Sequence, residues 1–358
     1  MRYMFIYFLH VDSLLFNLRE ELKMALKPIE LQAKLKKGGV SYMVVTPFNE
    51  YGEIDYDGLR ENALWLVDKI KDFDDCTITP AGSNGEFPNL SHEEHKKVIK
   101  TVVDAVAGRK TVVVGAGRAS TYETVELCKY AEEIGADGVQ VILPYYFVPF
   151  ESGMYEHYKH IAEAINIGIV IYNNPAFSGS WLKPPLVKKM IDDFGADGKI
   201  AGVKENTPHL MLFNAMAKML KKTPVALHSG FGEQWYAYQY PWGANGLATP
   251  FGNFFPEYPR DVYKASLKKD NAKIQELLDM MDPYYAFVGR CTAARKDTGI
   301  LTKPGGMIYG EGNIRFGVVK AAMNLMGLHG GYMRLPLEGP DEKETAELKE
   351  ILRDLKLL

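Results

Sequence analysis

From Gly39 onward, short runs of β-branched and other apolar residues alternate with amphipathic helical stretches, which is the pattern of repeated βα units. Eight such runs can be counted, and each ends in Gly, Pro or Asn. Strands this apolar are covered on both faces, and eight of them in strict alternation with helices close more naturally as a barrel than as an open sheet. The sequence therefore predicts a (β/α)8 barrel. The runs cover residues 41–47, 75–82, 110–117, 138–144, 168–175, 199–206, 224–230 and 243–250.

The helical stretches between these runs carry their own start signals. Ser91 and Glu94 form a capping box ahead of a stripe of apolar residues, and Ser120 with Glu123 repeats the device before the next helix. After about residue 255 the alternation stops and helical patterns follow one another. They predict a small all-α region with helices over residues 258–267, 271–289, 315–326 and 341–355.

The pattern divides the chain into three parts. We expect an N-terminal extension over residues 1–36, the (β/α)8 barrel over 37–256 and a C-terminal helical region over 257–358. Met24 opens a polar, helix-prone stretch that leads straight into the first run. Residues 1–23 are therefore interpreted as the product of an over-extended gene start and are left out of the predicted fold.

Composition excludes several classes of function. Lys and Arg total 42 and Asp and Glu total 45, so the formal charge is −3, with no long run of one sign to attract nucleic acid or an anionic membrane. The three cysteines are widely spaced, which argues against a disulfide framework and favours the cytoplasm. His10 and Asp12 interrupt the apolar start, which is read as neither a signal peptide nor a membrane span. A small-molecule partner is expected.

Two polar side chains stand at the ends of neighbouring apolar runs. Lys204 lies near the end of the sixth and Tyr172 near the end of the fifth, so both are expected at the barrel mouth, where barrels place their active sites. A lysine there can attack a ketone if burial or a nearby cation lowers its pKa. A tyrosine beside it can give and take a proton. A lysine ion-paired with Glu205, and a tyrosine that only packs its ring, are the competing interpretations.

A Gly-rich turn, Gly82-Ser83-Asn84-Gly85-Glu86, follows the second run. Its backbone N–H groups can converge on an anion such as a substrate carboxylate, although an ordinary βα turn has the same composition. Residues 112–120 also look like the start of a dinucleotide-binding motif, but Ser120 replaces the third glycine. The histidines form no HxH or HExxH pair. Neither a nicotinamide cofactor nor a metal is expected.

These features occur together, and in the same order, in one family of barrel enzymes. From Gly39 to Leu337 the chain resembles the dihydrodipicolinate synthase and N-acetylneuraminate lyase family of class I aldolases. The resemblance implies a lyase that holds a pyruvate-type 2-oxo acid as a Schiff base on a lysine, with no cofactor and no metal. The matching motifs are Thr46-Pro47-Phe48 with Gly52 and Asp55, GSNGE at 82–86, Tyr172-Asn173-Asn174-Pro175, and Gly202-Val203-Lys204.

The resemblance also implies roles for individual residues. Lys204 would form the imine, Tyr172 would transfer protons, and the Ser83 hydroxyl would join the relay. Tyr146 matches a tyrosine that family members lend across a dimer interface, which implies a homo-oligomer built as a dimer of dimers. The residues expected to bind the substrate are Ser83, Asn84, Gly85, Phe177 and Ala248.

Departures from the family pattern leave the exact reaction open. Dihydrodipicolinate synthases place an arginine for a second carboxylate where this chain has Phe177, which disfavours that reaction. GSNGEF at 82–87 looks more like 4-hydroxy-2-oxoglutarate aldolase, and sugar-acid dehydratases and hydratase-aldolases are similar barrels. An aldehyde is thus a candidate second substrate. The stretch 287–312 exceeds the family norm and is expected to shape the mouth or only to decorate the C-terminal helices. An alternative from a different class of function is a barrel that binds a 2-oxo acid without catalysing a reaction.

Overall fold

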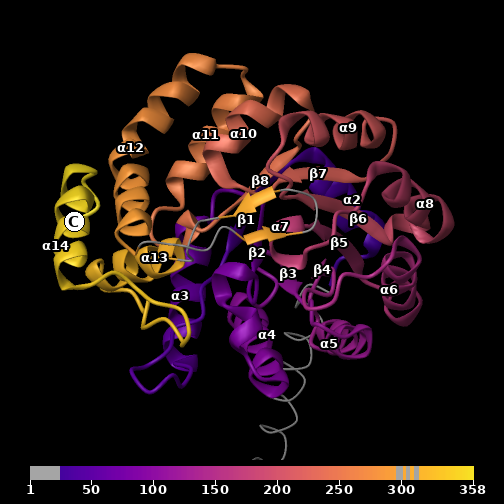
Figure 1. The fold of residues 1–358 in the computed structure, drawn as a ribbon, viewed down its shortest axis with the longest axis horizontal. Coiled ribbons are helices and arrows are strands. Elements are labelled where there is room, and N and C mark those ends of the chain that lie inside the picture. The colour runs from indigo at the N-terminus through magenta and orange to yellow at the C-terminus, as the bar shows by residue number, and fades with distance from the viewer. Residues whose placement is uncertain (1–24, 296–300, 304–306, 310–313) are drawn as a thin grey trace, which may run out of the picture.

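Eight parallel strands close into a barrel in chain order, because each strand pairs with the next and the eighth pairs with the first. The computed structural model describes residues 25–295, 301–303, 307–309 and 314–358. Helices surround the barrel (Figure 1), so the expected (β/α)8 architecture is confirmed. The strands are β1 (Gly39–Met43), β2 (Cys76–Thr79), β3 (Thr111–Gly115), β4 (Gly138–Ile142), β5 (Gly168–Asn173), β6 (Ile200–Glu205), β7 (Ala226–Ser229) and β8 (Gly246–Thr249).

The first strand begins and ends earlier than the apolar run that predicted it. The chain leaves the sheet after Met43 because the side chain of Asn253 takes over the backbone hydrogen bonds at this point. The Asn253 amide donates to the carbonyl of Met43 at 2.7 Å, and its oxygen accepts from the N–H of Val45 at 3.0 Å. The apolar residues that follow β1 are therefore loop residues at the barrel mouth, a difference that alternation alone does not reveal.

The barrel helices begin close to the predicted signals. The Ser91 hydroxyl accepts a hydrogen bond from the N–H of Glu94, and the N–H of Ser91 donates one to the Glu94 carboxylate, as the capping box predicts. Ser120 caps its helix differently, by accepting from the N–H of Tyr122 at 3.2 Å rather than through Glu123. These helices are α2 (Pro28–Lys37), α3 (Tyr56–Lys69), α4 (His92–Val106), α5 (Thr121–Glu133), α6 (Glu151–Ala164), α7 (Pro175–Ser178), α8 (Pro184–Phe194), α9 (Leu210–Leu220), α10 (Gly232–Gln239) and α11 (Glu257–Leu267).

Helix α2 closes the end of the barrel at which the strands begin. Its Leu31 and Leu35 are buried and pack with Val113, Val170 and other strand residues, a contact in which each leucine contributes roughly 1.5–3 kcal/mol. Gly138 leaves room for this plug, because a Cβ atom there would lie 2.5 Å from a methyl group of Leu31. Residues ahead of the barrel are thus part of its core. The start at residues 1–23, interpreted above as over-extended, lies outside the described residues.

The C-terminal region contains the expected helices α12 (Asn271–Ala294), α13 (Ile314–Leu325) and α14 (Glu342–Asp354). It is not all helical, however, because β9 (Leu301–Lys303) and β10 (Met307–Tyr309) form an antiparallel pair. Arg290 and Arg295, at the end of α12, form ion pairs with Glu347 and Glu344 of α14. This part of the long stretch 287–312 therefore joins C-terminal helices to one another.

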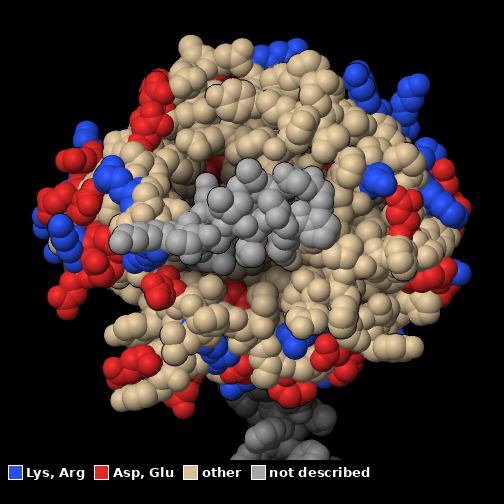
Figure 2. All heavy atoms as spheres, in the orientation of Figure 1, with Lys and Arg blue, Asp and Glu red and all other residues tan. Residues whose placement is uncertain are grey.

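The surface carries no field of one charge on the face in view. Lys and Arg lie interspersed with Asp and Glu around its edge (Figure 2). Among the residues that the structure describes, no helix has the length and apolarity needed to cross a membrane. The same residues contain no group of three or more His, Cys, Asp or Glu side chains placed to hold a metal ion.

Candidate active site

Lys204 lies near the end of β6, in line with the residues predicted to accompany it. The strand register places Tyr172 of β5, Lys204 of β6 and His228 of β7 side by side. Lys204 is buried, with only 5% of its surface exposed. The expectation that Lys204 and Tyr172 adjoin is thus confirmed, because strands that follow one another in the chain are neighbours in this barrel.

The amine of Lys204 is surrounded by weakly polar groups. Its Nζ lies 4.1 Å from the centre of the Tyr172 ring and 3.5 Å from the thioether sulfur of Met43. Burial lowers the pKa of Lys204, and the positive charge of Arg315 acts in the same direction, while Tyr172 acts against both. A lowered pKa increases the fraction of neutral amine, which is the nucleophilic form.

Glu205, the proposed ion-pair partner of Lys204, serves another purpose. One carboxyl oxygen accepts from the Asn173 amide and the other from the N–H of Thr207, both at 2.8 Å. Burial raises the pKa of Glu205 to about 7, so much of it is uncharged near neutral pH. Glu205 therefore braces the ends of β5 and β6 from outside the barrel, and the ion-paired interpretation of Lys204 finds no support.

The hydroxyl of Tyr172 has a partner that the sequence did not indicate. Asn174 Nδ2 donates to this oxygen at 2.7 Å. The expected relay partner Ser83 is near the same barrel end, yet its buried Oγ has no hydrogen-bond partner within the described part of the chain. Tyr146 is 81% exposed and its ring contacts Phe147, so a single chain does not bring it into the buried cluster.

The Gly-rich turn folds as a short 3-10 helix over Ser83–Gly85. Gly85 suits this close contact, because a Cβ atom would lie 3.1 Å from the carbonyl oxygen of Val44 and 3.3 Å from the hydroxyl of Thr46, and these neighbours would have to shift slightly. Thr46 in turn donates to the Gly85 carbonyl at 2.8 Å. Two stretches matched by the resemblance, the one after β1 and the one after β2, therefore pack directly on each other. Asn84, the middle residue of the turn, is half-buried.

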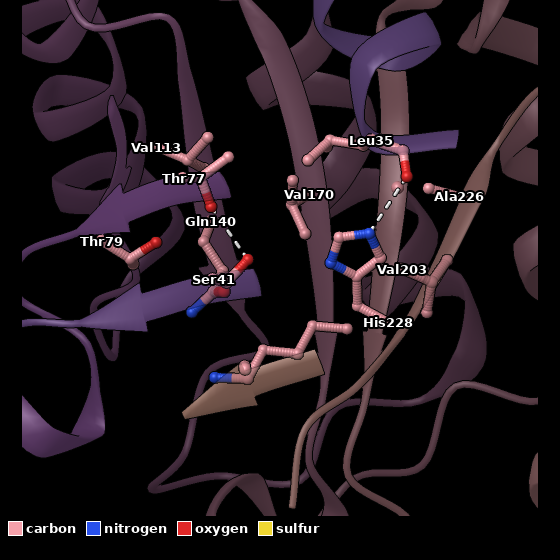
Figure 3. Close-up of a pocket in the computed structure, with 13 residues that line it drawn as sticks. Leu35, Ser41, Thr77, Thr79, Val113, Gln140, Val170, Val203, Ala226 and His228 are labelled. Atoms are coloured by element: carbon pink, nitrogen blue, oxygen red, sulfur yellow. Dashed lines mark hydrogen bonds between the residues drawn. The ribbon is translucent and has the colours of Figure 1, made fainter. Parts of the chain in front are cut away.

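A small cavity of about 10 Å³, with both polar and apolar side chains around it, lies inside the barrel beside Lys204, lined by residues from all eight strands and by Leu35. Ser41, Thr77 and His228 point into it from β1, β2 and β7 (Figure 3). His228 Nε2 lies 3.1 Å from the Leu35 carbonyl and so carries the hydrogen. Burial lowers the pKa of His228 to about 4, which keeps the ring neutral beside the lysine. Ala248 lines the same cavity and is buried.

One predicted residue lies apart from this cavity, and two residues that contact the site were not predicted. Phe177 is half-buried in the short helix α7 and does not line the cavity. Met43 and Asn174, which contact Lys204 and Tyr172, were not singled out from the sequence. Inward alternation in the first strand could have indicated Met43, and Asn174 carries a weak signal because an asparagine directly before Pro175 is a common helix cap.

Comparison with known sequences places the chain among one group of barrel enzymes. The profile of the family described as "Dihydrodipicolinate synthetase family" matches residues 36–286. The 4-hydroxy-tetrahydrodipicolinate synthase of Methanocaldococcus jannaschii is 33% identical over 320 residues, which cover 89% of this chain and 99% of the relative. The enzyme of the same name from Methanococcus maripaludis is 32% identical, with the same coverage of both chains.

Solved structures give the same picture. A crystal structure described as dihydrodipicolinate synthase is 34% identical, with a TM-score of 0.73, and the match covers 90% of this chain and 100% of the other. The dihydrodipicolinate synthase of Aquifex aeolicus is 29% identical, with a TM-score of 0.75, and covers 89% of this chain and 98% of its own. These relatives are named for the dihydrodipicolinate synthase reaction, which Phe177 disfavours.

Proposed function

Because the chain belongs to the dihydrodipicolinate synthetase family and is an aldolase-type lyase, we propose that it holds a pyruvate-type 2-oxo acid as a Schiff base on Lys204. The observation that carries this proposal is the burial of Lys204 at the strand ends, with its amine against the Tyr172 ring and its pKa lowered. Burying a charged lysine in these surroundings destabilises the fold, whereas a neutral amine is tolerated and is the reactive form.

The proposed chemistry starts with attack of the neutral Lys204 amine on the ketone carbon. The N–C bond forms, the π electrons move to oxygen, and Tyr172 gives its proton to that oxygen. The phenolate then takes a proton from the nitrogen, and loss of water leaves the imine. The imine withdraws electrons from the neighbouring carbon, so a C–C bond to that carbon can be formed or broken.

The substrate is proposed to bind at the barrel mouth beside Lys204. The backbone N–H groups of Ser83 and Asn84, with Gly85 closing the turn, are proposed to hold the 2-oxo acid carboxylate. Ala248 and Phe177 are proposed to lie along the substrate. Tyr146 is proposed to act in the site of a neighbouring subunit, and its exposure supports this. The oligomer would then be a homotetramer made of such dimers, placed in the cytoplasm.

A second candidate function is 4-hydroxy-tetrahydrodipicolinate synthase itself. The names of the relatives favour it, while Phe177 lacks the charge that a carboxylate on the second substrate would need. Supplying the protein with pyruvate and a panel of aldehydes, with and without a carboxylate, separates these reactions. Release of pyruvate from 4-hydroxy-2-oxo acids tests aldol cleavage, and loss of water from sugar acids tests dehydration.

The decisive experiment for the imine is borohydride reduction in the presence of pyruvate. We expect Lys204 to gain the mass of one pyruvate less one oxygen atom, found by peptide mass spectrometry. Lys110, another buried lysine but paired with Asp74, offers the matched control. Lys110→Ala should keep the modification and Lys204→Ala should lose it. An unmodified Lys204, or full activity in Lys204→Ala, would refute the proposal, and pyruvate binding without any turnover would support a non-catalytic barrel.

A further inference from the structure

We propose that Asn174 is a positioning residue, which directs proton transfer by Tyr172 and stabilises the phenolate that this transfer leaves. The inference rests on the proposed function. Asn174 is 2% exposed, and its Nδ2 lies 2.7 Å from the Tyr172 hydroxyl oxygen. An amide N–H at this distance from an oxygen that becomes negatively charged is a preorganised stabilising group.

The orientation of the Asn174 amide is set by the segment that follows it. Its Oδ1 accepts from the N–H of Phe177 at 3.3 Å and so caps helix α7. A flipped amide would point its N–H groups at the N–H of Phe177, which would leave two donors facing each other. The cap therefore forces Nδ2, and not Oδ1, toward Tyr172.

This orientation decides what the tyrosine can do. Because its oxygen accepts from Asn174, the hydroxyl hydrogen must point to a different acceptor. Under the proposed function the carbinolamine would form on the Lys204 amine, which lies 4.1 Å from the ring centre, so its oxygen would be a nearby acceptor. The pKa of Lys204 is lowered mainly by burial, Tyr172 acts against this and Arg315 adds to it, while Lys204 helps to lower the pKa of the neighbouring His228. The Asn174 hydrogen bond is thus kept while the proton leaves and returns, and it strengthens when the phenolate forms.

Two substitutions separate this role from support of the fold. Asn174→Ser keeps a helix-capping oxygen but removes the donor to Tyr172, and Asn174→Asp keeps the cap but places an acceptor against the phenol. Loss of a hydrogen bond to a charged group corresponds to a decrease in kcat of roughly 10- to 100-fold. We expect this decrease in Asn174→Ser, with KM for pyruvate unchanged. The decrease should be larger in Asn174→Asp and should lessen as the pH falls and the new carboxyl takes up a proton.

The assay is exchange of the methyl hydrogens of pyruvate for deuterium, followed by proton NMR, which needs no second substrate. Ser178→Ala is the matched control, because Ser178 Oγ bonds the backbone of Asn174 and Ser180 in the same segment without contact to Tyr172. It should retain kcat. Wild-type kcat in Asn174→Asp, or an equal decrease in Ser178→Ala, would overturn the inference. Absence of exchange and of borohydride trapping in the wild type would instead overturn the proposed function, and the inference with it.

Discussion

Glu86 and Lys320 form a buried ion pair that joins the end of the Gly-rich turn to helix α13, with 0% and 2% of their side chains exposed. Lys320 also donates to the carbonyl of Tyr332 at 2.7 Å, and Glu86 accepts from the N–H of Arg334 at 3.1 Å. Burial lowers the pKa of Lys320 to about 8, although Glu86 acts against this. The turn proposed to hold the substrate carboxylate is therefore held in place by the C-terminal region.

Removing one member of this ion pair should destabilise the folded protein. Lys320→Met leaves Glu86 buried without its cation, and we expect the free energy of unfolding to fall by about 3–5 kcal/mol. Adding Glu86→Gln to the same chain should restore part of that loss, because no buried charge remains. Urea unfolding of both single variants and the double variant measures the effect. Lys188→Met, which breaks an exposed pair with Asp192, should change stability by less than about 1 kcal/mol. A similarly small change in Lys320→Met would contradict the prediction.

Replacing Arg315 should alter the reactivity of Lys204. Because the charge of Arg315 lowers the pKa of Lys204, Arg315→Gln should raise that pKa and reduce the neutral fraction of the amine at neutral pH. The rate of borohydride trapping with pyruvate, followed against pH, should then rise at a higher pH than in the wild type. Arg315→Lys keeps the charge and should leave the curve nearly in place. Coincident curves for Arg315→Gln and the wild type would show that Arg315 does not act on the lysine.

A buried acid outside the proposed site should make stability depend on pH. Burial raises the pKa of Glu233, in α10, to about 7 from its usual value of 4.5, although Tyr285 donates to it at 3.2 Å. Between these pH values the folded protein binds more protons than the unfolded chain, so the free energy of unfolding decreases as the pH rises from about 4.5 to 7. Above pH 7 this group causes no further decrease. Glu233→Gln cannot ionise and should lack this decrease.

The comparison of Glu233→Gln with the wild type is made by denaturant unfolding at both ends of that pH range. The free energy of unfolding of the variant relative to that of the wild type should rise by about 3 kcal/mol from the acidic to the neutral pH. This value is the pKa shift multiplied by 1.36 kcal/mol per unit. Glu163→Gln, on the exposed face of α6, is the control and should show no such gain. A difference that is the same at both pH values would rule out Glu233 as the source.

Phe177 offers a test of how the second substrate is selected. Phe177→Arg places a guanidinium where dihydrodipicolinate synthases are expected to hold a carboxylate. We expect kcat/KM to rise about 10- to 100-fold for an aldehyde that carries a carboxylate, and to stay unchanged for a neutral aldehyde. Phe177→Leu controls for loss of the ring. Equal effects of Phe177→Arg on both aldehydes would mean that this position does not select for charge.

Local patterns in the sequence were enough to predict much of the fold. Apolar periodicity, turn residues and the capping box at Ser91 are properties of adjacent residues, so the eight strands and the helices after residue 255 could be placed without coordinates. The adjacency of Lys204 and Tyr172 could also be predicted, since consecutive strands of a barrel are neighbours. The C-terminal strand pair was missed because strands of three residues leave too short an apolar pattern to detect.

The sequence by itself thus determined the barrel, the order of its strands and the pairing of a lysine with a tyrosine at their ends. Tertiary structure decided what surrounds that pair: the Met43 thioether at the amine, the Asn174 amide at the phenol, and the Glu86–Lys320 contact between residues 234 positions apart. These contacts depend on register, rotamers and burial summed over distant parts of the chain. No local pattern encodes them, because the same residues in another register would face other partners.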